Sequence, residues 1–148
     1  MWRMVFNEDL AARDLSSLRV ATIAGEPPAA SDIKALHERV CTQLVSMYLS
    51  AEGHMASGVI AFTPSLLRPG KAASTGRPAP GVRLRIIDPE GGFDDALPQG
   101  VEGEIAIAGA SMASGYWKDP ELSRMRFRDG WWRSGDLGRI DEDGDLWV

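Results

Sequence analysis

The hydrophobic pattern of this chain changes near residue 65. Up to that point, short apolar runs alternate with a helical repeat, whereas beyond the loop at residues 64–80 apolar and polar side chains alternate with a period of two. Period-two segments between Gly- and Asp-rich turns are typical of antiparallel strands. We therefore expect a mixed α/β fold. Residues 1–64, the α/β portion, would form a βαβ unit of a parallel sheet, and residues 65–148, the β-rich portion, a small antiparallel sheet or barrel.

The α/β portion reads as strand, turn, helix and strand. Residues 18–23 form an apolar run that ends at Gly25-Glu26-Pro27-Pro28, where two prolines prevent further strand pairing. Ser31 is the expected cap of the following helix. The apolar side chains of that helix share one face: Ile33, Leu36 and Val40. A second strand is predicted at residues 44–48, so the order indicates parallel strands joined by a crossover helix.

The β-rich portion is punctuated by turns and one short helix. Residues 82–86 and 104–107 alternate in character, with the arginines of the first run on the solvent face. The helix is expected after Asp119 as its cap, with Pro120 in the first helical position. Residues 137–148 read as a hairpin around an Asp-Gly turn whose second strand stops at the end of the chain. We expect such a chain to come from a longer protein.

Charge and composition argue against several classes of protein. The chain has 16 Lys and Arg against 21 Asp and Glu, a net charge of -5, whereas a nucleic-acid surface needs clustered positive charge. No apolar run approaches the roughly 20 residues of a membrane span, and the N-terminus turns polar at Asn7, too early for a secretory signal. The cytoplasm is therefore the expected location. Cys41, the single cysteine, excludes an internal disulfide and is expected to be a small apolar filler.

Two familiar motifs are set aside because their details do not fit. Residues 141–145 have the acids and the glycine of a calcium loop, but the glycine comes too early and no closing glutamate follows, so a hairpin turn is the better interpretation. Residues 109–113 lack the final glycine of a nucleophile elbow. His37 and His54 both precede that segment, opposite to the order in hydrolases, and neither has metal-ligand spacing.

Two loops of the α/β portion carry residues suited to ligand binding. In residues 24–28 a glycine permits the close approach of a flat ligand and the prolines stiffen the loop, although an ordinary turn explains this segment equally well. In residues 48–53 an aromatic ring, a hydroxyl group and Glu52 follow a strand, at the edge of a parallel sheet where α/β ligand sites lie. Glu52 is a candidate Mg²⁺ ligand there, with a solvated surface glutamate as the alternative.

A third loop, in the β-rich portion, carries a candidate ribose ligand. Asp136 follows a glycine and lies three positions beyond Arg133, close to a pair of tryptophans. A carboxylate in this setting can accept both hydrogen bonds of a ribose diol, which a neutral side chain of that length does not match. A capped turn is the alternative interpretation.

In order and spacing these segments resemble the adenylate-forming superfamily of acyl-CoA synthetases, peptide-synthetase adenylation domains and luciferases. The resemblance covers nearly the whole chain and rests on five ordered blocks. They are Asp14–Arg19 leading to Gly25-Glu26-Pro27, then Tyr48–Glu52, Gly76–Gly81, Gly103–Ile107 continuing to Leu122, and Trp132–Leu137. It implies that residues 1–64 belong to the large adenylation domain and residues 65–148 to its β subdomain, ending just before the family's hinge.

The resemblance implies a two-step reaction. A carboxylate attacks the α-phosphate of ATP to give an acyl-adenylate and pyrophosphate, and the thiol of CoA then displaces AMP. Residues at matching positions would hold the nucleotide: Gly25, Glu26 and Pro27 around the adenine, Tyr48 beside the base, Asp136 at the ribose and Glu52 on Mg²⁺. ATP, Mg²⁺, CoA and a small-molecule carboxylate are thus the implied ligands of the parent enzyme.

The block at residues 48–52 departs from the family pattern, which reads Tyr-Gly-any-Thr-Glu. Leu49 stands at the glycine position and Ala51 at the threonine position. The missing hydroxyl removes an α-phosphate contact worth about 1–3 kcal/mol, for which Ser50 is the candidate replacement. In the family that glycine lies along the acyl pocket, so Leu49 predicts a short or compact acyl group.

Other parts of the family pattern are missing from this sequence. They are the Ser/Thr/Gly-rich phosphate loop, the hinge and the C-terminal domain with its catalytic lysine, so we expect the fragment by itself to be inactive. Two alternatives stay open. One is a peptide-synthetase adenylation domain, which delivers its acyl group to a carrier protein. The other is a degenerate, non-catalytic relic that at most binds a nucleotide or a partner, and Leu49 and Ala51 favour it.

Overall fold

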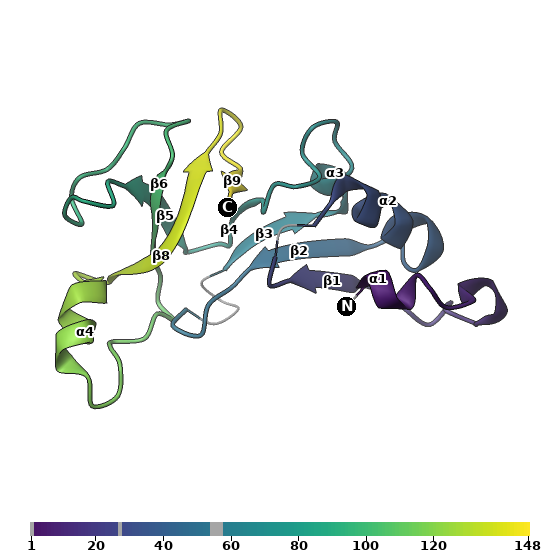
Figure 1. Ribbon diagram of the computed structural model, residues 1–148, viewed down its shortest axis with the longest axis horizontal. Coiled ribbons are helices and arrows are strands. Elements are labelled where there is room, and N and C mark those ends of the chain that lie inside the picture. The colour runs from purple at the N-terminus through teal and green to yellow at the C-terminus, as the bar shows by residue number, and fades with distance from the viewer. Residues whose placement is uncertain (1, 27, 54–57) are drawn as a thin grey trace.

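The computed structural model describes residues 2–26, 28–53 and 58–148, which form two sheets beside each other along the long axis of the molecule (Figure 1). The first part of the chain contains α1 (Trp2–Val5), a short 3-10 helix η1 (Leu10–Ala12), β1 (Ala21–Ala24), α2 (Ala30–Arg39), β2 (Leu44–Tyr48), β3 (Val59–Phe62) and α3 (Thr63–Leu66). The second part contains β4 (Arg77–Pro78), β5 (Arg83–Ile87), β6 (Gly103–Ala108), α4 (Pro120–Arg126), β7 (Phe127–Arg128), β8 (Trp131–Ile140) and β9 (Leu146–Trp147).

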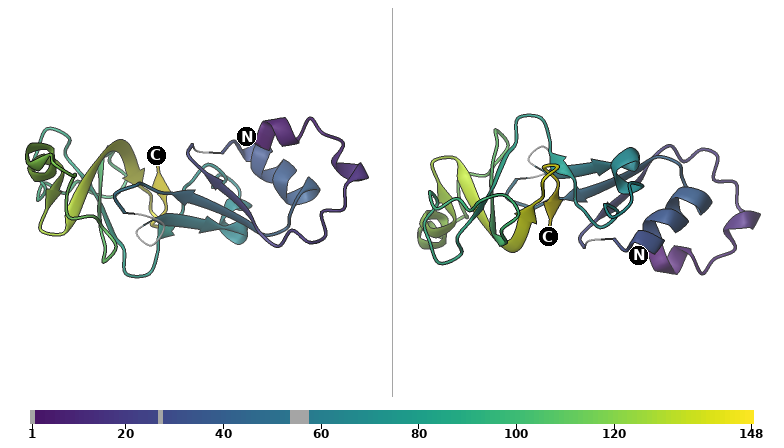
Figure 2. Two further views of the ribbon diagram at one scale, coloured as in Figure 1. Left: turned by 90° about the horizontal axis from the view of Figure 1, so that it is seen from below. Right: turned by 90° about the horizontal axis from the view of Figure 1, so that it is seen from above.

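The first sheet has the order β1-β2-β3-β4. β1 and β2 are parallel, with Ala21 opposite Leu44, and α2 connects them along one side of the sheet (Figure 2). The predicted βαβ unit is therefore confirmed, and β2 has the predicted bounds. β3 and β4 continue the sheet in antiparallel fashion, so the sheet is mixed and extends to residues 77–78.

The start of α2 differs from the prediction. The helix begins at Ala30 with Ala29 as its N-cap and no side-chain cap, so Ser31 lies inside the first turn rather than capping it. Asp32 in the same turn places negative charge near the helix N-terminus, where the exposed backbone N–H groups favour it. The helix can therefore begin without a capping hydroxyl.

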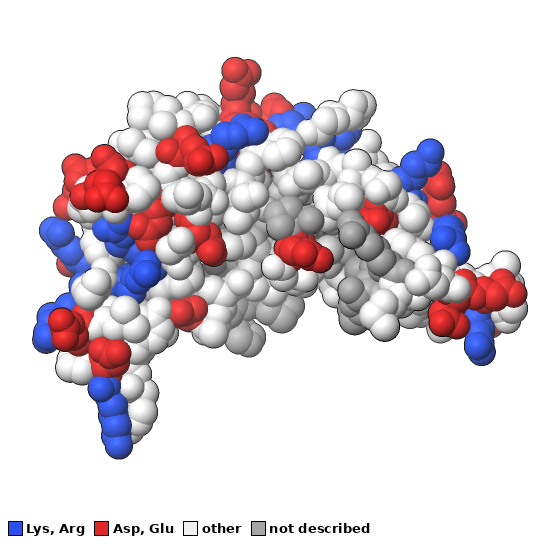
Figure 3. All heavy atoms as spheres, viewed as in Figure 1, with Lys and Arg blue, Asp and Glu red and all other residues white. Residues whose placement is uncertain are grey.

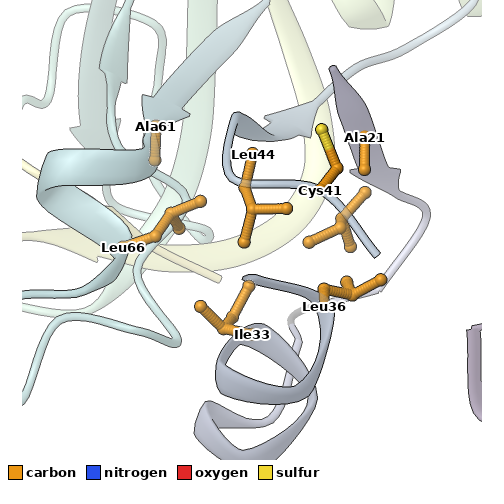
Figure 4. Packing of buried hydrophobic residues seen from close by; sticks show 8 residues of the cluster. Ala21, Ile33, Leu36, Cys41, Leu44, Ala61 and Leu66 are labelled. Carbon is orange, nitrogen blue, oxygen red and sulfur yellow. The ribbon is translucent and has the colours of Figure 1, made fainter. Parts of the chain in front are cut away.

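A compact cluster of apolar side chains lies between α2 and the first sheet. Ile33 and Leu36 extend from α2 toward the strand residues Ala21 and Leu44 (Figure 4), and all four are at most 5% exposed. Cys41 joins this cluster, which confirms its predicted role as an apolar filler. Burial of such side chains, at about 25 cal/mol per Å² of apolar surface removed from water, holds the helix on the sheet.

The opposite face of the first sheet is more open. Side chains on the two faces of a strand alternate, and the face turned away from α2 carries residues that are partly or fully exposed: Thr22, Ala24, Val45, Met47, Ile60 and Phe62. Phe62 is 59% exposed. Within the described residues, the first sheet is thus covered by a helix on one face only.

The second sheet is antiparallel, with the order β5-β6-β8-β7 and β9 paired to β8. Its centre is β6, in which every residue is buried, including Glu104 and Ala106, so the alternation of this strand does not mark a solvent face. The predicted antiparallel sheet is confirmed. It is open rather than a closed barrel, because β5 and β7 lie at its edges among the described strands.

Local signals in the β-rich portion were predicted correctly. The side chain of Asp119 accepts a hydrogen bond from the Leu122 N–H at 2.9 Å and Pro120 opens α4, as expected. β8 and β9 form the predicted hairpin, with Ile140 opposite Leu146.

Within the described residues no helix is long and apolar enough to cross a membrane. Acidic and basic side chains are interspersed over the face of the molecule in Figure 3.

Gly76 joins the two sheets. Its carbonyl accepts a 2.7 Å hydrogen bond from the Leu146 N–H of β9, and the Thr75 N–H donates to the Leu146 carbonyl at 2.8 Å. Gly76 has a φ of +98°, and a side chain there would lie 2.2 Å from the Ile60 carbonyl oxygen of β3. Only glycine suits this position, because the backbone is left-handed and β3 leaves no room for a Cβ atom.

Candidate functional site

A cleft of about 200 Å³ opens at the carboxyl ends of β1 and β2. Strand β2 and the loops after β1 and β2 supply residues from the α/β portion, and the β-rich portion adds residues from three separate segments. The lining residues are Gly25, Glu26, Ser46, Met47, Tyr48, Leu49, Thr75, Asp136 and Val148. Ligands of open α/β sheets bind at this edge of the strands, so the cleft is the candidate functional site.

Tyr48 and Asp136 meet in the cleft. The Tyr48 hydroxyl donates a 2.5 Å hydrogen bond to Oδ2 of Asp136. Burial raises the pKa of Tyr48, and the hydrogen bond to the Asp136 carboxylate raises it further. Tyr48 therefore stays protonated and remains a donor at neutral pH, whereas the Asp136 side chain is exposed to solvent and to any ligand in the cleft.

A bulge in β8 presents Asp136. The pairing of β6 with β8 shifts between Glu104 and Ala106, which leaves residues 134–136 of β8 between the paired residues Arg133 and Leu137. Gly135 takes a φ of +83° in this bulge, and the Asp136 N–H donates to the Ser134 hydroxyl at 3.0 Å. Bulges re-aim side chains out of the regular alternation, and here the result is a carboxylate directed to the cleft.

A buried carboxylate, Glu104, holds the bulge from behind. Its Oε1 accepts hydrogen bonds from the Gly135 N–H at 3.0 Å and from Nη1 of Arg126 at 3.3 Å. Its Oε2 accepts from Nε of Arg133 at 2.8 Å and also from the Nη2 atom of that guanidinium. Arg133 in turn donates to the carbonyls of Pro89 and Gly91, each at 2.9 Å. The charge of Glu104, only 6% exposed, is thereby paired and hydrogen-bonded.

Glu52 lies in the turn after β2, and the β-rich portion holds it there. Its Oε1 accepts a 2.8 Å hydrogen bond from the Tyr116 hydroxyl, and its carbonyl accepts from the Ala113 N–H at 2.7 Å. Burial raises the pKa of Tyr116, so the hydroxyl remains a donor. Glu52 does not line the cleft.

The surroundings of Glu52 fit a divalent cation. Tyr116 uses one carboxylate oxygen, and Oε2 has no hydrogen-bond partner among the residues that the structure describes. Mg²⁺ is commonly bound through one or two carboxylates together with the phosphates of a nucleotide. A half-buried carboxylate with one oxygen fixed by Tyr116 suits that role.

The sequence pattern of one protein family, described as AMP-binding enzyme, matches residues 1–117. The chain belongs to this family. It is 37% identical over 135 residues to the indoleacetate–CoA ligase of Aromatoleum aromaticum, a match of 91% of this chain and 25% of that protein. It is 31% identical over 153 residues to the fatty acid–[acyl-carrier-protein] ligase ScoC of Streptomyces coeruleorubidus, with 100% of this chain and 28% of that protein covered.

Solved structures of other proteins share the fold. The amide bond synthetase McbA from Marinactinospora thermotolerans matches with a TM-score of 0.86 at 34% identity, over 99% of this chain and 28% of that one. The anthranilate CoA ligase AuaEII, solved in complex with anthranoyl-AMP, matches with a TM-score of 0.76 at 29% identity, over 95% and 26% of the two chains. The predicted fold class is confirmed, and the chain spans about a quarter of the length of these relatives.

The structure brings five of the predicted site residues to one place. Gly25, Glu26, Tyr48, Leu49 and Asp136 line the cleft. Pro27 and His54 lie outside the described residues. Three further predicted residues do not line the cleft: Glu52, which is held by Tyr116, Ser50, whose hydroxyl accepts the Gly53 N–H at 3.0 Å, and Ala51, which is exposed in the turn.

Two residues of this site were not expected from the sequence. Glu104 is an acid in a strand that is buried on both faces, which indicates a buried partner. That partner, Arg133, is 29 residues away in the sequence. Tyr116 is 64 residues from Glu52 and lies in a block of the family pattern with no role assigned to it. Both contacts depend on tertiary structure, which local patterns do not encode.

The acids of the β8–β9 turn form an ion-pair network rather than a metal site. Asp141, Asp143 and Asp145 place their oxygens close enough together for a cation, but the Lys71 ammonium lies among them at 2.5, 2.7 and 3.2 Å. The hydrogen bonds to Asp141 and Asp143 raise the pKa of Lys71. The backbone N–H groups of Asp143 and Asp145 both donate to Oδ1 of Asp141, which shows the predicted hairpin turn.

Proposed function

We propose that this chain is the nucleotide-holding part of an AMP-forming acid–thiol ligase, which activates a carboxylate with ATP and transfers the acyl group to CoA. The observation that carries the proposal is the cleft in which Tyr48 of the α/β portion meets Asp136 of the β-rich portion. Family membership and relatives named as CoA ligases support it.

Each residue of the site has a proposed role. Gly25 and Glu26, with Pro27, flank the adenine, and Tyr48 lies beside the base. Asp136 accepts the hydrogen bonds of the two ribose hydroxyls, a contact that an ionised carboxylate makes well. Leu49, Ser50 and Ala51 lie along the phosphates and the acyl group. Glu52 holds Mg²⁺, which supplies positive charge to the phosphates when it is bound.

Leu49 sets the expected acyl substrate. Leu49 lines the cleft at a position where the family pattern has a glycine, so a side chain there reduces the space for the acyl group. We propose a compact acid as the substrate of the complete enzyme. The relatives named for indoleacetate and anthranilate are consistent with a compact acid. A substrate panel in which the complete enzyme prefers long-chain acids would overturn this assignment.

Calorimetric titration of the chain with AMP tests the nucleotide-holding role. We expect measurable binding that weakens about 10- to 100-fold in Asp136→Asn, because a bond to a charged group is worth about 1.5–3 kcal/mol. Asp129→Asn, the same substitution in an exposed turn that does not line the cleft, is the matched control and should bind normally. The chain alone is expected to release no pyrophosphate from ATP and a carboxylate.

Two alternatives concern the complete protein. Delivery of the acyl group to a carrier protein is supported by the similarity to ScoC, named as an acyl-carrier-protein ligase, and a comparison of CoA with a carrier protein as acceptor decides between the two. A non-catalytic relic is supported by Ala51, which places no hydroxyl in the turn. If the complete protein bound ATP but released no pyrophosphate with any acid, the relic would be favoured.

A further inference from the structure

The turn that carries Glu52 is held by a loop of the β-rich portion. Residues 109–116, the support loop, make three hydrogen bonds to residues 52–53. Tyr116 donates to the Glu52 carboxylate, the Ala113 N–H donates to the Glu52 carbonyl at 2.7 Å, and the Ser111 hydroxyl donates to the Gly53 carbonyl at 2.9 Å. Within its own turn, the Gly53 N–H donates to the Ser50 hydroxyl at 3.0 Å.

Tyr116 is itself fixed in place. Its ring packs edge to face against Phe127, with centroids 5.3 Å apart and planes at 68°, a favoured aromatic geometry. Its backbone N–H donates to the Ser123 hydroxyl at 2.7 Å. The side chain therefore has a defined position relative to α4 and β7, which carry Ser123 and Phe127.

The hydrogen bonds at the Tyr116 hydroxyl have a fixed direction. Trp132 Nε1 lies 3.3 Å from the Tyr116 oxygen, and an indole N–H can only donate. The Tyr116 oxygen therefore accepts from Trp132, and its own proton goes to Oε1 of Glu52, at 2.8 Å. This chain of donors leaves Oε2 as the oxygen of Glu52 with no hydrogen-bond partner in the part of the chain that the structure describes.

We propose that Tyr116 is a positioning residue for Mg²⁺-nucleotide binding, which holds the Glu52 carboxylate so that its second oxygen faces the cation. The proposal rests on the function proposed above. It separates two parts of nucleotide recognition: AMP needs the cleft with Tyr48 and Asp136, whereas the gain in affinity that Mg²⁺ gives to ATP needs Glu52 and the support of Tyr116.

Tyr116→Phe tests the proposal, because it keeps the ring against Phe127 and removes only the hydroxyl. Binding of AMP, of ATP with EDTA and of ATP with Mg²⁺ is measured by calorimetry on the full chain. We expect the Mg²⁺-dependent gain in ATP affinity to fall about 3- to 10-fold, less than the roughly 10- to 100-fold effect of a lost ligand contact, because the Tyr116 hydroxyl acts only through Glu52. The affinity for AMP should be unchanged.

Glu52→Gln and the double variant show whether Tyr116 acts through Glu52. Once Glu52 is replaced, removal of the Tyr116 hydroxyl should have no further effect on the Mg²⁺-dependent gain. An equal loss in both backgrounds, a Mg²⁺-dependent gain that Tyr116→Phe leaves unchanged, or a matching loss of AMP affinity would overturn the proposal. If the unsubstituted chain bound neither AMP nor ATP, the proposed function itself would fail, a result distinct from these.

Discussion

The two portions of the chain differ in how far their sheets are buried and in which residues they supply to the site. The first sheet is packed against α2 on one face and has Phe62 exposed on the other, whereas β6 at the centre of the second sheet is buried along its whole length. The α/β portion supplies strand-end loops with Tyr48 and Glu52. The β-rich portion supplies Asp136 and the supports for both loops. The cleft thus needs both portions. The β-rich portion is largely a scaffold for the loops of the α/β portion.

The largest expected effect concerns the scaffold. Glu104→Ala should lower the free energy of unfolding by about 3–5 kcal/mol, because it leaves the Arg133 guanidinium, 15% exposed, without its buried partner. Urea denaturation measures the loss. Glu102→Ala removes an exposed acid two positions away and should change stability by about 0.5 kcal/mol or less. A loss below about 1 kcal/mol in Glu104→Ala would contradict the role given to this carboxylate.

The two faces of the first sheet give the next contrast. Leu36→Ala, at a side chain 1% exposed under α2, should cost about 2–5 kcal/mol of unfolding free energy. Phe62→Ala, on the open face and 59% exposed, should cost roughly 1 kcal/mol or less. Thermal or urea unfolding compares the pair. Equal losses would show that the open face is covered in solution.

The junction between the sheets is tested at Gly76. Gly76→Ala should cost about 2–4 kcal/mol, because the left-handed backbone disfavours a Cβ atom and the Ile60 carbonyl lies where that atom would go. Gly81→Ala shares the positive φ but has nothing within 4 Å, so only the backbone cost should remain. Calorimetric unfolding separates the two variants. Equal costs would mean that the contact with β3 adds nothing.

The smallest expected effect is a pH dependence of the β8–β9 turn. Burial opposes ionisation of Asp141, but hydrogen bonds from Lys71 and from the Trp147 indole outweigh it and hold the pKa of Asp141 below its ordinary value. A lowered folded-state pKa stabilises the fold above the unfolded pKa of about 3.9, and this contribution is lost as the pH falls through the folded pKa.

Asp141→Asn should therefore lower stability near neutral pH, and its difference from the parent chain should shrink as the pH falls below about 4. Urea unfolding at several pH values measures this trend. Glu142→Gln changes the exposed neighbour in the same turn and should follow the pH profile of the parent chain. A difference for Asp141→Asn that is constant with pH would contradict the ion-pair assignment.

Local chemistry made much of the fold predictable from the sequence. Residues 44–48 were predicted as a strand and form β2, and Asp119 with Pro120 was predicted to open α4 because cap chemistry is local. The loops with Tyr48 and Asp136 were also predicted as ligand-binding segments. The structure places both in one cleft.

Features that depend on distant partners were not predictable in this way. In the bulge that presents Asp136, Glu104 accepts the Gly135 N–H across the sheet, and no local pattern shows that register shift. The cap expected at Ser31 was wrong because the N-cap of α2 is Ala29, two residues earlier, and the helix begins at Ala30. The support of Glu52 by Tyr116 likewise appears only when the two portions are brought together.

The central claim, that the two portions together form a ribonucleotide site, is tested most directly by calorimetric titration of the chain with AMP and with 2′,3′-dideoxy-AMP. The two ligands differ only in the hydroxyls that Asp136 is proposed to bind. We predict that AMP binds about 10- to 100-fold more tightly, because its ribose hydroxyls make charge-assisted hydrogen bonds to the Asp136 carboxylate. Equal affinities for the two ligands, or no binding of AMP, would contradict the claim.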